Sequence, residues 1–190
     1  MTLWRLDSSH SSIGFSARHM MVGTIRGSFH TFRLDAEFDP QHPQMGHVKA
    51  VVQAATIDTG EAQRDTHLRS EEFLAAEQFP TILFTSTHVD QRGNGAFGLH
   101  GDLTIRGGTR PVVFDVTYLG DVANHQGGRS AGFTARGRIS RSEFGLAWNV
   151  SLEAGGVLVS DEVQIEVDIE LVQAAATTPD LPAKAVEVTA

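Results

Sequence analysis

The chain has 190 residues, a length that suits one domain and lets a folded chain bury about 70% of the surface exposed when unfolded. Its 15 Lys and Arg against 23 Asp and Glu give a formal net charge of −8, which argues against nucleic acid or an anionic bilayer as the main partner. Cysteine is absent, which excludes disulfides, thiolate nucleophiles, iron–sulfur clusters and Cys-ligated zinc.

The first residues, Met1 to Asp7, lead directly into a strand-like pattern. They contain no basic segment, apolar segment and small-residue cleavage site of the kind that makes up a signal peptide. No stretch of the chain approaches the ~20 consecutive apolar residues of a membrane helix. We therefore expect a cytoplasmic protein without stable membrane insertion.

Alternation of apolar and polar residues with a period of two dominates the chain and predicts half-buried β-strands. The first clear run places Ile13, Phe15, Ala17 and His19 on one face of a strand. The same alternation recurs over residues 32–38, 48–54, 82–88, 97–105, 112–118, 133–139 and 163–171. Turn-forming Gly, Pro, Asn and Asp residues separate the runs, and in total the pattern predicts eight or nine strands.

Two segments depart from this pattern. Between Glu61 and Ala76, apolar residues at helical spacing predict one short helical insertion, which Pro80 ends. From Gln173 onward the composition changes to Ala, Thr and Pro, which predicts a flexible tail over residues 173–190. The alternative is a tail docked on the domain or on a neighbour. Residues 1–172 form the expected domain.

So many strands with one apolar face must close or stack to protect their edges. The long runs over residues 25–38 and 160–171 favour a closed sheet, and Gly27, Gly101 and Gly137 within strands allow the bends that closure needs. We therefore expect an all-β fold, an antiparallel barrel of about eight strands. The 11 phenylalanines could fill such a barrel or line a tube for an elongated ligand, and the period alone leaves both open.

Five segments, in chain order, resemble the signatures of the YceI-like family. They are Trp4-x-Leu6-Asp7-x-x-His10-Ser11-x-Ile13-x-Phe15-x-x-x-His19 with Gly27-x-Phe29; Arg64-Asp65-x-His67-Leu68-x-Ser70-x-x-Phe73 with Phe79-Pro80-x-Ile82-x-Phe84-x-Ser86; Gly101-x-Leu103-Thr104-Ile105-x-Gly107-x-Thr109-Arg110-Pro111-Val112; Arg141-x-x-Phe144-Gly145-Leu146; and Val163-x-Ile165-x-Val167-x-Ile169. The resemblance implies a lipocalin-like barrel that binds long apolar chains such as polyisoprenoids or fatty amides. Some members are periplasmic and carry leaders, whereas this chain shows none. A homodimer is consistent with the resemblance.

The resemblance and the alternating pattern together predict which side chains line the tube. The expected apolar contacts of the ligand are Phe15, Ala17, Phe29, Leu34, Phe84, Leu99, Leu103, Phe114, Val116 and Phe133. Each buried methylene contributes about 0.8 kcal/mol, so twenty ligand carbons represent a gross term on the order of 15 kcal/mol. Ordering the chain and losing translation remove much of that free energy.

Polar residues at the mouth of the barrel are candidates for contacting a head group. His19 continues the inward face of its strand and either meets the ligand or bonds to the backbone within the core. His10 lies in a predicted turn, where we favour turn stabilisation over ligand contact. Trp148 and Asn149 either form a lid with a head-group contact or simply pack.

The helical insertion opens with Arg64, Asp65 and His67. We favour a structural role, in which Asp65 caps the helix or pairs with Arg64. In the functional alternative, Arg64 or His67 faces the mouth and holds an anionic or amide head group.

Three arginines, Arg136, Arg138 and Arg141, follow one strand and its turn. We expect an outward, solvated face, and the alternative is a phosphate clamp on the inside.

The sequence predicts no catalytic residue, no cofactor and no metal ligand set. No His-x-His or His-Glu-x-x-His spacing occurs, although a site assembled from His19, His67 and His88 stays open. The primary hypothesis is a non-catalytic carrier or sequestering protein for a long-chain isoprenoid or fatty-acid-derived lipid, without nucleic acid. The alternatives are a metal-assisted enzyme acting on an apolar small molecule in the same cavity and a packed barrel that serves as an interaction module.

Overall fold

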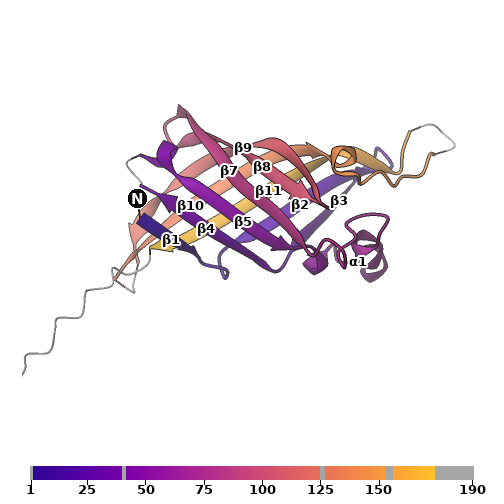
Figure 1. Cartoon of the computed structure of the whole chain (residues 1–190), viewed down its shortest axis with the longest axis horizontal. Coiled ribbons are helices and arrows are strands. Elements are labelled where there is room, and N and C mark those ends of the chain that lie inside the picture. The colour runs from indigo at the N-terminus through magenta and orange to yellow at the C-terminus, as the bar shows by residue number, and fades with distance from the viewer. Residues whose placement is uncertain (1, 40–41, 125–126, 153–155, 174–190) are drawn as a thin grey trace, which may run out of the picture.

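The computed structural model describes residues 2–39, 42–124, 127–152 and 156–173 (Figure 1). Its elements in chain order are β1 (Thr2–Leu6), β2 (Ser12–His19), β3 (Gly23–Phe29), β4 (Phe32–Phe38), η1 (Pro43–Met45), β5 (His47–Gln53), η2 (Ala54–Thr56), β6 (Ile57–Asp58), α1 (Ala62–Arg69), β7 (Thr81–Gly93), β8 (Ala96–Ile105), β9 (Gly108–Ala123), β10 (Arg129–Ser140), η3 (Arg141–Phe144) and β11 (Val159–Gln173). The predicted tail lies outside the described residues except for Gln173, which ends β11. No described helix is long and apolar enough to cross a membrane.

Eight of the strands form a closed antiparallel ring. The order is β1, β4, β5, β7, β8, β9, β10 and β11, and the ring closes because β1 pairs with both β4 and β11. This confirms the predicted antiparallel barrel of about eight strands with one short helical insertion. A barrel of this size is wide enough to be filled by side chains or to hold one small ligand.

Three positions of the ring are each shared by two consecutive strands. Along one edge of β11, residues 159–168 pair with β2 and residues 171–173 pair with β1. The next position is shared by β3 and β4, which pair with β2 and β1 respectively. The third is shared by the short β6 and β5, which pair with β3 and β4. The chain therefore contains more separate strands than the eight or nine that the alternation predicts.

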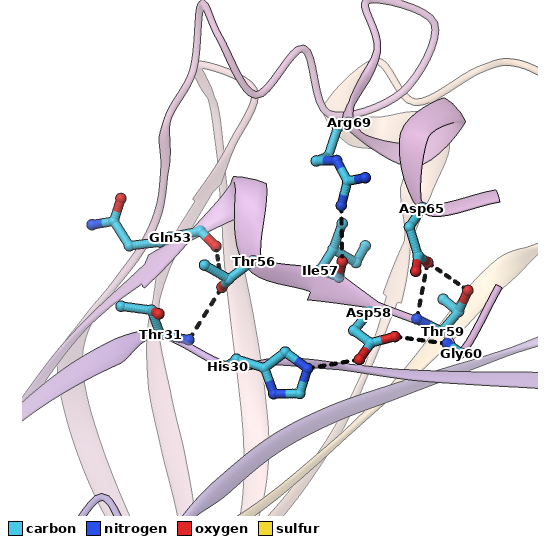
Figure 2. Close-up of polar contacts among 10 residues, drawn as sticks. All are labelled: His30, Thr31, Gln53, Thr56, Ile57, Asp58, Thr59, Gly60, Asp65 and Arg69. Atoms are coloured by element: carbon cyan, nitrogen blue, oxygen red, sulfur yellow. Dashed lines mark hydrogen bonds and ion pairs between the residues drawn. The ribbon is translucent and has the colours of Figure 1, made fainter. Parts of the chain in front are cut away.

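Polar contacts explain why the predicted strand over residues 25–38 is broken in two (Figure 2). The backbone N–H of Thr31 donates to Thr56 Oγ1 over 3.1 Å, and the Thr56 hydroxyl donates to the carbonyl of Gln53 over 2.8 Å. His30 Nε2 lies 2.8 Å from Asp58 Oδ2. The interruption between β3 and β4 is thus bonded directly to the interruption between β5 and β6, and both positions bend at the same level of the barrel.

The helix α1 is shorter than predicted and is capped by a different residue. Glu61, rather than Asp65, accepts hydrogen bonds from the N–H groups of Gln63 and Arg64, at 3.0 and 2.7 Å. The helix ends at Arg69, since Ser70 is extended and its hydroxyl donates to the carbonyl of His67 over 2.8 Å. Turns rather than helix follow up to residue 76.

The buried core divides into two groups that lie toward opposite ends of the barrel. One group gathers around α1 and η3 and contains Leu74, Phe84, Phe114 and Phe144. The other surrounds Trp4 at the end where β1 lies. Figure 1 shows α1 and the N-terminal strand at opposite ends of the elongated barrel.

Glycines in three strands make room for phenylalanine rings. A Cβ atom would lie 2.4 Å from the Phe15 ring if added at Gly27, 2.5 Å from the Phe84 ring at Gly101 and 2.6 Å from the Phe114 ring at Gly137. The φ angles at these three glycines are not positive, so the absence of a side chain is what the packing uses. Each ring therefore lies against the backbone of the glycine on the neighbouring strand, in the place that a side chain would otherwise occupy.

Candidate ligand-binding cavity

An apolar cavity of about 320 Å³ lies inside the barrel. This volume falls within the range of about 300–1,000 Å³ that is usual for small-molecule sites. The alternating inward residues of the strands form the lining, together with Leu68, Phe73 and Leu74 from the segment around α1. Among the described lining residues, Arg141 is the one with a charge.

All ten predicted apolar contacts line this cavity: Phe15, Ala17, Phe29, Leu34, Phe84, Leu99, Leu103, Phe114, Val116 and Phe133. Their contact with a ligand remains a prediction. The five predicted polar and aromatic contacts at the mouth, namely His19, Arg64, His67, Trp148 and Asn149, are not among the described lining residues.

The segment that begins with α1 covers one end of the cavity. His67 packs edge-on against the rings of Phe73 and Trp148, with centroids 5.0 and 4.6 Å away, and its Nε2 lies 2.6 Å from Glu72 Oε2. Phe73 lines the cavity, whereas His67 and Trp148 lie behind it. The structure therefore gives His67 and Trp148 packing roles in this cover.

Arg106 ties two parts of the cover together. It occupies the tight turn between β8 and β9, with a φ of 50°. Its guanidinium donates to the carbonyl of Gly145 over 2.8 Å and to that of Glu71 over 2.7 Å. The turn after α1 and the turn after η3 are thus held side by side.

Thr59 anchors the start of α1 through Asp65 and Arg64. Asp65 Oδ1 accepts from the Thr59 N–H over 2.9 Å and from its hydroxyl over 2.6 Å (Figure 2). Arg64 donates to the Thr59 hydroxyl over 2.7 Å and to its carbonyl over 3.1 Å. The expected pairing of Asp65 with Arg64 is therefore replaced by a shared contact with Thr59, and Arg64 does not reach the cavity.

Arg141 is buried at the same end and binds backbone carbonyls. Its Nε donates to Ser160 O over 2.9 Å, its Nη1 donates to Trp148 O over 2.9 Å and to Leu146 O, and its Nη2 lies 3.5 Å from Val159 O. These contacts fasten the segment after η3 to the beginning of β11. Burial lowers the pKa of Arg141, but a guanidinium keeps its charge in proteins.

The expectation that the three arginines share an outward face is wrong for Arg141. Arg136 and Arg138 do point outward, with side chains 79% and 70% exposed, and lie 3.7 and 4.0 Å from the carboxylates of Glu166 and Glu162. Arg141 is separated from Ala135 and Ile139 by even numbers of residues, so the alternation along the strand places it on the same inward face as they are. This pattern in the sequence could have identified it.

Asn149 also has a structural role. Its side chain donates to Val159 O over 2.8 Å and accepts from Val159 N over 3.1 Å and from Val150 N over 3.0 Å. It therefore pairs with β11 as a neighbouring strand would. The sequence alone leaves both a lid and simple packing open for this segment.

Aromatic rings fill the opposite end of the barrel. Trp4 stacks on Phe38 with a centroid distance of 4.8 Å, Phe38 meets Phe133 edge-on at 5.3 Å, and Tyr118 lies 5.0 Å from Phe133. Phe38 and Phe133 line the cavity while Trp4 is almost fully buried beneath them. The cavity thus has an aromatic floor and a cover built around α1.

In the part of the chain that the structure describes, the donor atoms of His19, His67 and His88 do not come close enough together to share a metal ion. Among the described residues, a different group has its donor atoms within 4.8 Å of one another: Asp7, His10 and Glu170. His10 Nδ1 lies 3.1 Å from Asp7 Oδ2 in the exposed turn between β1 and β2. This contact gives His10 the turn-stabilising role that the sequence favoured.

We expect the pKa of His10 to lie above its ordinary value. The hydrogen bond to Asp7 and the charges of Asp7 and Glu170 raise the pKa of His10 from 6.5. A raised pKa means that the ionised histidine stabilises the fold below pH 6.5, and that this contribution is lost as the pH rises through the raised value. An NMR titration should show this, and Asp7→Asn should move the midpoint back down. A midpoint at or below 6.5 in the unmodified protein would contradict the geometry.

Comparisons with known proteins agree with this architecture. The model of the YceI-like domain matches residues 4–171. The protein YceI of Salmonella newport is 33% identical over 167 residues, which cover 88% of this chain and 84% of that relative. A UPF0312 protein of Vibrio cholerae is 34% identical over 138 residues, 73% of each chain.

Two solved structures are similar in fold. BcnA of Burkholderia cenocepacia has a TM-score of 0.75 at 23% identity, with 87% of this chain and 98% of that chain covered. A polyisoprenoid binding domain from Saccharophagus degradans, implicated in plant cell wall breakdown, has a TM-score of 0.63 at 12% identity, with 92% and 100% covered. At these identities the likeness concerns the fold.

Proposed function

Because the chain belongs to the YceI-like family, we propose that its barrel binds a long-chain isoprenoid or a similar apolar lipid and carries or sequesters it without catalysis. The observation that carries this proposal is the apolar cavity of about 320 Å³ that runs from the aromatic floor to the cover. The Saccharophagus degradans domain of similar fold, which is described as polyisoprenoid binding, supports the same class of ligand.

The lining supports a chain without a fixed head-group contact inside the barrel. Each methylene that leaves water for such a lining contributes about 0.8 kcal/mol, whatever the branching of the chain. The charged lining residue, Arg141, directs its guanidinium to backbone carbonyls of the protein itself. We propose that the ten predicted apolar residues contact the chain and that discrimination between ligands depends on the depth of the cavity.

The same lining favours a carrier over an enzyme. General acid–base or nucleophilic catalysis requires an ionisable or hydroxyl group that faces the reacting atoms. In the part of the lining that the structure describes, no histidine, carboxylate, serine or threonine faces the cavity. We therefore propose that a bound lipid leaves the barrel chemically unchanged.

The proposal is tested by competition on delipidated protein. An apolar fluorescent probe such as N-phenyl-1-naphthylamine would be displaced by a series of isoprenoid alcohols from geraniol through farnesol and solanesol to undecaprenol. We expect affinity to rise with chain length up to a limit set by the cavity, and a chelator to leave binding unchanged. Failure of every member to displace the probe would refute the lipid-binding role. Recovery of a chemically altered alcohol would refute the non-catalytic one.

A further inference from the structure

The hairpin between β2 and β3 carries exposed apolar side chains at its tip. Met20, Met21 and Val22 are consecutive, and 45%, 65% and 85% of their surfaces are exposed. Three adjacent large apolar residues in water are unusual in a soluble domain unless they have a function. The tip lies at the same end of the molecule as α1 (Figure 1).

The backbone of this turn is not one that methionine favours. Met20 and Met21 have φ angles of 49° and 63°, so two bulky residues adopt the left-handed region. Met20 and Met21 are the central residues of a turn that the Val22 N–H closes on His19 O over 3.1 Å, and Asn-Gly is the usual pair where both central φ angles are positive. The two methionines are therefore not required by the turn, and strain of this kind is often found at functional sites.

A second segment adds to the apolar surface. Met20 N donates to Leu158 O over 2.8 Å, and a Cβ atom at Gly156 would lie 3.7 Å from Met21 Cγ. In this neighbouring segment Val150 and Val157 are also exposed. We call the exposed set of Met20, Met21, Val22, Val150 and Val157 the apolar tip.

The charge of the β2–β3 hairpin is opposite to that of the whole chain. Residues 8–34 contain no Asp or Glu, although the chain has 23 of them. Arg18 and Arg26 lie on β2 and β3 next to the tip, and both are exposed. Arg18 donates to Thr24 Oγ1 over 3.2 Å, and within the described residues neither arginine has an ion-pair partner. The hairpin is thus locally cationic on a protein of net charge −8.

From this combination we propose that the apolar tip docks reversibly on the surface of a lipid bilayer, with Arg18 and Arg26 facing anionic head groups. Apolar side chains that enter the interface beside basic residues are the usual composition of a peripheral membrane contact. A specific protein–protein interface uses about 20–30 residues on each side, far more than the five side chains of the tip. A bilayer requires no such complementary surface.

The apolar tip lies close to residues that line the cavity. Ala17 precedes the tip by three residues, Val159 is the register partner of His19, and both line the cavity. Within the described residues, β3 pairs on its second side only at Ser28 and Phe29, so its first residues form an open edge beside the tip. Docking would bring this end of the cavity to the bilayer. The inference goes beyond the proposed function and does not depend on the identity of the ligand.

Flotation with vesicles tests the docking, using phosphatidylcholine with phosphatidylglycerol and phosphatidylcholine alone. The double variant Met20→Asn with Met21→Gly restores the preferred turn and removes the two methionines, so it should fold while its vesicle-bound fraction falls at least tenfold. The double variant Leu119→Asn with Val122→Thr removes exposed apolar residues near the C-terminal end of β9, away from the tip. It should bind as the unmodified protein does. Arg18→Gln with Arg26→Gln should weaken binding only to the vesicles that contain phosphatidylglycerol.

Insertion can be observed directly because the chain has no cysteine. An environment-sensitive NBD label at Met21→Cys should shift to shorter wavelength with vesicles, whereas the same label at Val122→Cys should not. The proposal is overturned if the unmodified protein does not float with either vesicle, or if the Asn-Gly variant floats equally well. It is also overturned if sedimentation shows dimers that the Asn-Gly variant loses, since the tip would then be a protein contact.

Discussion

Filling the cavity through Val116→Trp together with Ala50→Phe should lower the affinity for long isoprenoid alcohols at least tenfold while the barrel stays folded. Both residues line the cavity, from β9 and β5 respectively. Displacing only two ligand methylenes removes about 1.6 kcal/mol, which already exceeds the factor of ten that corresponds to about 1.4 kcal/mol. Competition with the fluorescent probe measures the affinity, and thermal unfolding reports on the fold.

A matched control lies one residue away in each strand. Thr117 and Lys49 point to the outer face of the barrel because side chains alternate along a strand, and both are exposed. Thr117→Trp with Lys49→Phe therefore adds the same rings outside the cavity and should leave the affinity within twofold. Equal losses in the two double variants would show that the rings act on the fold rather than on a ligand inside the barrel.

The second large effect concerns stability. Arg141→Met should lower the free energy of unfolding by about 3–4 kcal/mol and the Tm by about 10 °C, because it leaves buried carbonyls without donors. The carbonyls of Leu146, Trp148 and Ser160 would lose their partner together. Chemical and thermal denaturation measure the loss, and the cover over the cavity is the part we expect to loosen first.

Two further variants distinguish this explanation from a general effect of charge. Arg138→Met removes an arginine that is 70% exposed and should change stability by no more than about 0.5 kcal/mol. Arg141→Lys keeps the charge but cannot present the planar set of donors, so it should recover little of the loss. Full recovery by lysine would mean that charge, rather than the bonds to the carbonyls, stabilises this region.

Alternation, together with the resemblance to the YceI-like family, predicts the barrel and the apolar part of its lining. Successive side chains of a strand point to opposite faces, so a strand with one face toward solvent alternates polar and apolar residues. The apolar set Ile13, Phe15 and Ala17 therefore faces the cavity, as do Leu99 and Leu103 on β8. The glycines opposite phenylalanine rings are harder to interpret from sequence. Gly137 receives the Phe114 ring from the neighbouring strand, and that pairing appears only when the register is known.

The sequence is least informative where a polar side chain bonds to another segment of the chain. The break at Thr31 depends on the hydroxyl of Thr56, which local periodicity does not report. Similarly, Asp65 accepts a hydrogen bond from Thr59 instead of capping the helix, and the Asn149 side chain bonds to the backbone of β11. For the polar residues near the mouth, the sequence leaves ligand contact and a structural role open, and Arg64, His67 and Asn149 bond to other parts of the protein in the structure.

Native mass spectrometry of the freshly purified protein tests the whole interpretation most directly. We predict a population heavier than the 190-residue chain by a few hundred daltons or more, whose extra mass passes into organic solvent and is identified there as an isoprenoid or another long-chain lipid. A protein that carries no such mass and takes up no lipid when one is offered would contradict it. So would an added mass that a chelator removes.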